Sequence, residues 1–133
     1  MRRLRKRLLE RAEGSLEAAR WLLERGDTDL ALVLAEQAAQ FRIKAAQILL
    51  TGEHARGHDL RELLGVLRDV TGDERIDEFV REHAKALDVL DVAYTECRYG
   101  AWKPSKETVE WAIETTEELF ELLERLEEDH GPE

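Results

Sequence analysis

The chain has 133 residues, a formal net charge of −10 at pH 7 and one cysteine, Cys97. This length suits one domain, 1–133, with a core of its own, and a single cysteine excludes an internal disulfide and most cysteine-based metal sites. The negative charge argues against a general nucleic-acid-binding surface, and no apolar run approaches the roughly 18 residues of a membrane span. Because the first residues also lack the apolar stretch of a signal peptide, we expect a cytoplasmic protein.

The charge is distributed unevenly along the chain. Residues 1–25 carry eight basic and four acidic side chains, whereas residues 105–133 carry two basic and eleven acidic ones. Two interpretations stay open. Either the first and last helices lie side by side and attract each other, or the basic helix meets an anionic partner.

The first two predicted helices form a hairpin. Apolar residues recur with helical period over 2–25, and Trp21 lies off that apolar stripe. Gly26 is suited to end this helix, and Asp27 or Thr28 can cap the next one. A link this short makes the two helices antiparallel.

The second helix, 30–50, is apolar over most of its circumference, which predicts a central helix with neighbours on several sides. Apart from Arg42, its polar residues fall in one narrow stripe: Glu36, Gln37, Gln40, Lys44 and Gln47. Polar groups on a mostly buried helix are costly unless they find partners or face a cleft. This stripe is therefore the first candidate site.

A loop marked by Gly52 and Gly57 follows the central helix. Asp59 and Glu62 have the spacing of a capping box, which predicts a short helix that ends near Thr71. Two histidines, His54 and His58, lie in or next to the loop, and no third metal ligand accompanies them.

The next predicted helix begins after Asp73 and continues to Gly100, and the last one covers 105–129. His83 lies on an apolar face, and two interpretations of it stay open: a hydrogen-bonded core histidine or a functional group. Arg98 ends the same inward-facing line and needs an acceptor, which is either a carboxylate such as Glu36 or an anionic ligand.

No segment has the alternation of a strand, so we predict an all-α fold, an antiparallel up-and-down bundle of four to five helices. Trp21 lies off the core face of its helix, and Trp111 and Leu122 lie together on the outer side of the last helix. Exposed tryptophan is enriched at interfaces, so we expect these three residues to contribute to a homodimer interface. We find no metal-binding motif with enough ligands and expect no metal or cofactor.

Three stretches together resemble the HEPN domain family (higher eukaryotes and prokaryotes nucleotide-binding). They are AEQAAQFRIKAAQILL in the second helix, GHDLRELL at the start of the third and LDVAYTECRYG at the end of the fourth. The resemblance covers about residues 7–126. It implies a helical bundle, usually dimeric, that binds a nucleotide or substrate. It also implies a separate small nucleotidyltransferase chain as partner, sometimes as a toxin–antitoxin pair.

The positions that match the polar pattern of the family are Glu36, Gln37, Lys44, His58, Arg98 and Tyr99. Together with Gln40 they are the candidate ligand-binding residues. Ribonucleases of the family use an arginine followed by a histidine after four to six residues. No histidine follows Arg98 at that distance, and the pair with this spacing is Arg125 and His130, where Leu126 replaces the polar residue that the family prefers.

The sequence therefore favours a non-catalytic nucleotide-binding module over its alternatives, a ribonuclease toxin or a structural interaction protein without a small ligand. A nucleotide is the ligand that we expect. The three hypotheses differ in what the polar stripe contacts, which the sequence leaves open.

Overall fold

Seven helical segments follow one another in the computed structural model, which describes residues 1–132, and this part of the chain contains no strand. The segments are α1 (Arg2–Arg25), α2 (Thr28–Thr51), α3 (Leu60–Thr71), α4 (Glu74–Glu82), α5 (Ala84–Val92), the π-helical turn η1 (Ala93–Cys97) and α6 (Lys106–His130). The prediction of an all-α bundle is confirmed. None of the described helices is both long and apolar enough to cross a membrane.

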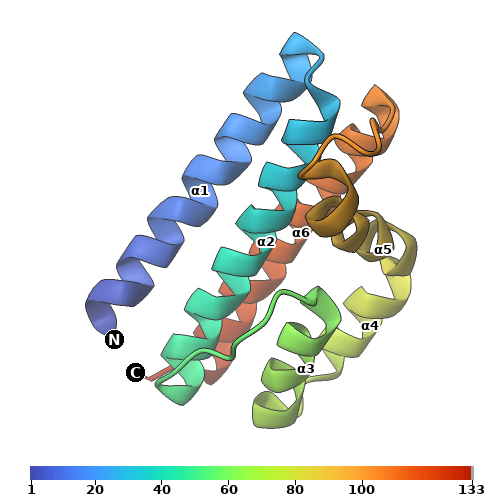
Figure 1. Ribbon diagram of the computed structural model, residues 1–133. Helices are drawn as coiled ribbons and strands as arrows, with labels where there is room; N and C mark the ends of the chain where they lie inside the picture. Colours follow the sequence, from blue (N-terminus) through green and yellow to red (C-terminus); the bar gives the residue numbers. More distant parts are fainter. Residues whose placement is uncertain (133) are drawn as a thin grey trace.

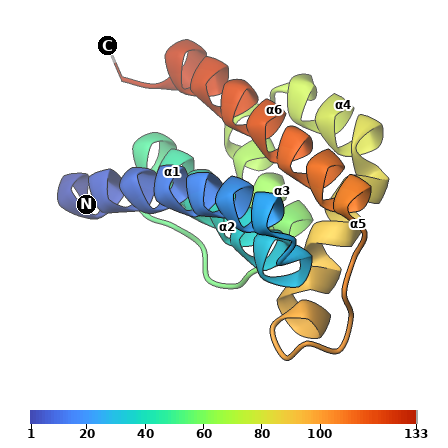
Figure 2. The same ribbon diagram turned by 90° about the horizontal axis from the view of Figure 1, so that it is seen from above.

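Helix α2 is the centre of the bundle, as its apolar circumference predicted. It packs against α1, α6, α3, α5 and η1, and its alanines at 31, 35, 38, 39, 45 and 46 are fully buried. Figures 1 and 2 show the three long helices α1, α2 and α6 together, with the short helices α3, α4 and α5 on the side away from α1. Of the short helices, α3 and α5 pack on the face of α2 that α1 leaves free.

Several helix boundaries follow from local chemistry. Gly26 ends α1 in the left-handed conformation, with φ of 88°. Asp59 caps α3 by accepting a hydrogen bond from the backbone N–H of Glu62 at 3.1 Å, which confirms the predicted cap. Helix α2 differs from the prediction, because neither Asp27 nor Thr28 provides a side-chain cap at its start.

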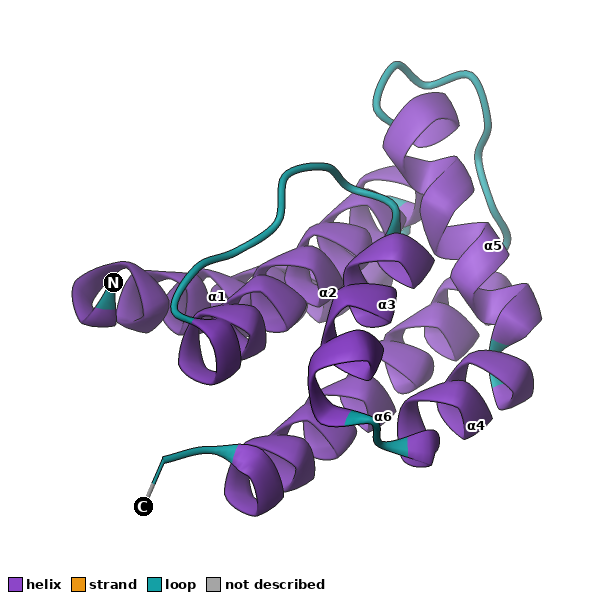
Figure 3. Ribbon diagram, turned by 90° about the horizontal axis from the view of Figure 1, so that it is seen from below, coloured by secondary structure: helices purple, strands orange, loops and turns teal. Residues whose placement is uncertain are grey.

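The predicted helix from Asp73 to Gly100 is three segments in the structure. Its first break is at His83, whose backbone has φ of −110° and ψ of 22°. The break redirects the chain (Figure 3), so that α4 packs between α3 and α6 whereas α5 and η1 pack on α2. The His83 ring lies 4.4 Å from the Phe79 ring, and its Nε2 lies 3.1 Å from a carboxylate oxygen of Glu118. His83 thus joins α4 to α6 at the break.

The first and last helices are adjacent and joined by ion pairs. Arg5 of α1 and Arg42 of α2 both donate to the Glu127 carboxylate, at 2.7 Å and at 2.6 and 2.9 Å respectively. A further pair joins Arg20 to Glu117. The first interpretation of the charge asymmetry is therefore correct for these residues.

The three residues predicted to lie at an interface have different environments. Trp21 and Trp111 are 55% and 41% exposed, whereas Leu122 is only 4% exposed and belongs to the core. Helix α4 covers that part of α6, where Leu122 and Phe79 line the same cavity. Leu122 consequently adds no exposed apolar surface, contrary to the prediction.

Candidate functional site

The polar stripe of α2 divides among three environments. Glu36, Gln40 and Lys44 follow one another at four-residue spacing, and the charges of Asp91 and Arg98 act on the first of them. Gln37 instead lines a groove against α1 with Arg11, Ser15 and other residues. The structure therefore separates Gln37 from the other predicted ligand-binding residues.

Gln47, the last member of the stripe, has a structural role. Its buried amide donates to the carbonyl of Leu63 at 2.9 Å and accepts from the backbone N–H of Ala55 at 2.8 Å. These two bonds attach the loop and α3 to α2. They hold the loop that carries His58 in a fixed place beside the site.

Glu36 is a fully buried carboxyl with incomplete hydrogen bonding. It is 0% exposed, and its Oε2 accepts a hydrogen bond from Gln40 Nε2 at 2.5 Å. Its other oxygen, Oε1, has no hydrogen-bond partner among residues 1–132. Burial raises the pKa of Glu36 to about 7; the charge of Asp91 also raises it, whereas Gln40, Arg98 and Lys44 oppose the shift.

Asp91 of α5 is the second carboxylate of the site. Its Oδ1 is buried and, within the described part of the chain, has no hydrogen-bond partner. Its Oδ2 lies 3.7 Å from the guanidinium of Arg61, and burial together with the charge of Asp59 raises its pKa. The sequence analysis did not select Asp91.

An aromatic stack lies beside Arg98, one of the two cations whose charge acts on Glu36. The rings of His58 and Tyr94 are parallel within 8°, with centroids 3.7 Å apart. The Arg98 guanidinium lies 5.0 Å from the Tyr94 centroid and 5.8 Å from that of Tyr99. Tyr99 itself is 82% exposed. The stack brings together the loop before α3 and the turn η1, which are distant in sequence.

The turn η1 determines the directions of the Tyr94 and Arg98 side chains. It carries Tyr94, and Arg98 follows it directly. A π-helical turn inserted in a helix changes the direction of the side chains after it, and such turns are frequent at functional sites. The spacing of Asp91, Tyr94 and Arg98 at i, i+3 and i+7 is a one-face helical pattern. This spacing could have directed attention to Asp91 and Tyr94 as neighbours of Arg98, but it does not indicate the contact of Tyr94 with His58.

Two cations of the site have no anionic partner. Neither Lys44 nor Arg98 forms an ion pair within 4 Å in residues 1–132. Both act on Glu36 through their charge. Arg98 is exposed and not inward-facing, and in the described residues it forms no ion pair with Glu36, so the prediction of an internal pair is wrong. The arrangement can thus bind an anion at the cations and an aromatic ring at the stack.

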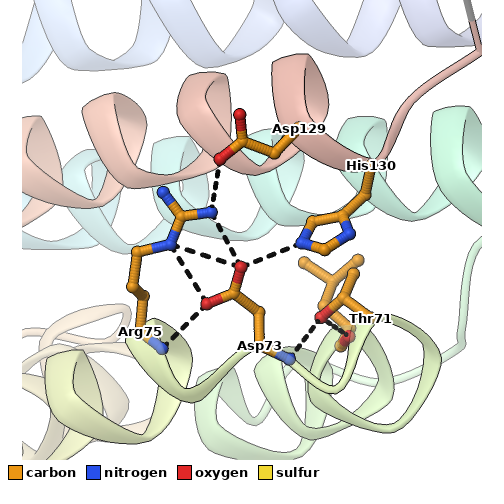
Figure 4. A network of polar contacts seen from close by, with 6 residues as sticks. Thr71, Asp73, Arg75, Asp129 and His130 are labelled. Carbon is orange, nitrogen blue, oxygen red and sulfur yellow. Dashed lines mark hydrogen bonds and ion pairs between the residues drawn. The ribbon is translucent and has the colours of Figure 1, made fainter.

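Arg125 and His130, the pair with the spacing found in ribonucleases of the family, lie away from the candidate ligand-binding residues. His130 Nε2 lies 2.9 Å from Asp73 Oδ2, in a network that includes Arg75 and Asp129 (Figure 4). These contacts hold the pKa of Asp73 well below its usual range. Arg125 lines a cavity of about 320 Å³ between α4 and α6. His130 therefore joins the end of α6 to the start of α4, and the pair is remote in the fold from η1.

The two loop histidines do not form a metal site. His54 Nδ1 lies 3.1 Å from the carbonyl oxygen of Ala55, and His58 stacks on Tyr94. Across the described residues, no group of three or more His, Cys, Asp or Glu side chains is arranged to hold a metal ion.

The chain as a whole is similar to one protein family and to a solved structure. The family model of the HEPN domain matches residues 5–126. The crystal structure of TT1696 from Thermus thermophilus is similar, with a TM-score of 0.76 and 28% sequence identity over 95% of this chain and 99% of that chain. No curated protein matches.

Proposed function

Because the chain belongs to the HEPN domain family, we propose that it is a non-catalytic module that binds a nucleotide or a related phosphate-bearing substrate at the face formed by α2, η1 and the loop before α3. The observation that carries this proposal is the pair of cations without an ion-pair partner, Lys44 and Arg98. Both act on Glu36 through their charge, and Arg98 also lies 5.0 Å from the Tyr94 ring, which stacks on His58.

Each part of the site has a task in this proposal. Lys44 and Arg98 bind phosphate oxygens, for which ammonium and guanidinium groups are the usual partners in proteins. The stacked rings and the exposed Tyr99 provide flat surfaces on which a base can rest. Glu36 has no exposed surface with which to touch a ligand, so it and Gln40 act on the cations indirectly. Gln40 donates to the buried Glu36 carboxyl, whose charge attracts Lys44 and Arg98.

We further propose that a separate small nucleotidyltransferase chain supplies the chemistry, in the manner of a toxin–antitoxin pair. The family resemblance supports this partnership. The exposed Trp21 and Trp111 support a homodimeric module, because large aromatic side chains outside the core favour contact with another chain.

Calorimetric titration with ATP tests the binding function. We expect saturable binding that the Lys44→Ala/Arg98→Ala variant weakens by at least about a hundredfold, because each of the two charge-assisted hydrogen bonds that it removes contributes roughly 1.5–3 kcal/mol. The matched control is Arg81→Ala/Lys85→Ala, which removes two exposed cations of α4 and α5 that make no ion pair within the described residues. It should bind as the unmodified chain does.

Two results would contradict the proposal. One is the absence of heat with ATP, GTP, CTP and UTP up to millimolar concentration. The other is an equal loss of affinity in the control variant, which would mean that the total charge of the chain, and not this site, governs binding.

A further inference from the structure

The burial of Glu36 is not explained by the packing of the bundle. The carboxyl is fully enclosed, yet it has one hydrogen bond, from Gln40, and one oxygen without a partner in the described residues. Asp91 Oδ1 is likewise buried and has no hydrogen-bond partner in the described residues. A buried carboxylate with incomplete hydrogen bonding lowers stability, whereas an apolar residue at position 36 would suit the core. A loss of stability of this kind at a candidate binding site indicates that Glu36 has a functional role.

The charged groups around Glu36 come from three segments. Lys44 lies on α2 itself, Asp91 on α5, and Arg98 directly after η1. The buried pair of Arg42 with Glu127 joins α2 to α6 and forms a separate ion-pair cluster with Arg5. His58 is also titratable, and its ring borders the cluster through Tyr94. Two negative and two positive charges thus meet where α2 packs on α5 and η1.

We propose that Glu36 is a positioning residue that couples phosphate binding to the uptake of one proton. The ionised carboxylate keeps the side chains of Lys44 and Arg98 in its field. When a phosphate group of the ligand binds these cations, a proton from solvent adds to Glu36, and the neutral carboxyl no longer competes for them. This inference rests on the proposed function, because it requires an anion at Lys44 and Arg98.

The electrostatics determine the sign of the coupling. Burial raises the pKa of Glu36 to about 7, so both forms of the carboxyl are populated at neutral pH. An anion bound nearby favours the neutral form and raises this pKa further. The bound state therefore holds more protons than the free state, and affinity must rise as the pH falls from 8 to 6.

Calorimetric titration with ATP at pH 6, 7 and 8, in two buffers of different ionisation enthalpy, measures both the affinity and the number of protons taken up. The variants are Glu36→Gln, which keeps the shape of the side chain and cannot titrate, and His58→Phe, which keeps a ring against Tyr94 and cannot titrate either. The terminal phosphate of ATP titrates in the same range, and its contribution is the same for every variant.

For the unmodified chain we expect proton uptake near pH 7. The ratio of its affinities at pH 6 and pH 8 should be about fivefold larger than that of Glu36→Gln, which is the effect of a rise of about one unit in the pKa of Glu36 on binding. His58→Phe should keep this difference. Asp91→Asn should move the pH dependence to lower pH, because it removes a charge that raises the pKa of Glu36. This variant also tests the coupling if Glu36→Gln does not fold.

The outcomes separate the two proposals. ATP binding with the same pH dependence and proton uptake in Glu36→Gln would overturn the coupling and leave the binding function intact. Loss of the pH dependence in His58→Phe alone would assign it to the histidine and also overturn the inference. The absence of ATP binding at every pH would overturn both the binding function and the coupling.

Discussion

Single residues of the site differ in what they contribute to stability. Glu36 lowers stability where it is ionised, because its pKa in the folded chain, about 7, is above the 4.5 of an exposed glutamate. The folded state therefore holds more protons than the unfolded state between these two values. Stability falls as the pH rises through this interval, and the full cost is present above pH 7.

This gives a prediction for the Glu36→Gln variant. The variant should be more stable than the unmodified chain, and this difference in the free energy of unfolding should increase by up to about 3 kcal/mol from pH 5 to pH 8. The size follows because one pKa unit corresponds to 1.36 kcal/mol. Urea denaturation followed by circular dichroism at both pH values measures the difference. The same stability difference at both pH values would show that Glu36 has an ordinary pKa in the fold.

The candidate residues show how far the sequence could identify the site. Glu36, Gln40 and Lys44 were predictable, because four-residue spacing places them on one face of α2. Gln37 is one residue, or 100° of helix rotation, from Glu36 and so faces α1 instead. Tyr94 was not selected from the sequence as a site residue, but η1 places it against His58. That contact depends on tertiary packing and has no local signal.

At the scale of the elements, the start of α4 is joined to the end of α6. Asp73 caps α4 by accepting from the backbone N–H of Arg75 at 2.9 Å, and it also pairs with the Arg75 side chain and His130. These contacts lower the pKa of Asp73. They therefore stabilise the fold at pH values above the usual pKa of an aspartate, and this stabilisation is lost as the pH falls below that value.

We therefore predict that Asp73→Asn lowers the free energy of unfolding by about 1 kcal/mol at pH 7, because asparagine keeps the N-terminal cap but loses the negative charge that binds Arg75 and His130. At pH 3 the difference should become smaller. Denaturant unfolding at the two pH values measures it. The control is Asp69→Asn, an exposed aspartate that makes no ion pair in the part of the chain described here. Equal effects of the two variants would contradict the assignment.

Most element boundaries follow from the sequence, whereas the division of the fourth predicted helix does not. Asp59, Asp73 and Ser105 cap helices through local contacts that their positions predict. His83, by contrast, lies in a periodic apolar pattern that continues on both sides of it. The helix breaks there so that α4 can pack on α6 and α5 on α2, which is a requirement of the tertiary fold.

At the scale of the whole molecule, the exposed tryptophans predict self-association. We expect the chain to sediment as a dimer at micromolar concentration and Trp21→Glu/Trp111→Glu to sediment as a monomer with unchanged helical circular dichroism. The mutated residues are 55% and 41% exposed, so the substitutions leave the core intact. A monomer in the unmodified chain at all concentrations would contradict this prediction.

The bundle itself was predictable from the periodicity, the short α1–α2 link and the apolar circumference of α2. The identity of a partner chain is not encoded in the same way, because one chain shows only half of an interface. The exposed surface indicates only where contact can occur.

The central claim is that a phosphate-bearing ligand binds where α2, η1 and the loop before α3 meet. Titration of the isotope-labelled chain with ATP, followed by amide and arginine side-chain NMR shifts, tests its location directly. We predict saturable shifts at Lys44, His58, Tyr94 and Arg98. Shifts centred instead on the cavity of Arg75 and Arg125 between α4 and α6, or none at millimolar ATP, would contradict it.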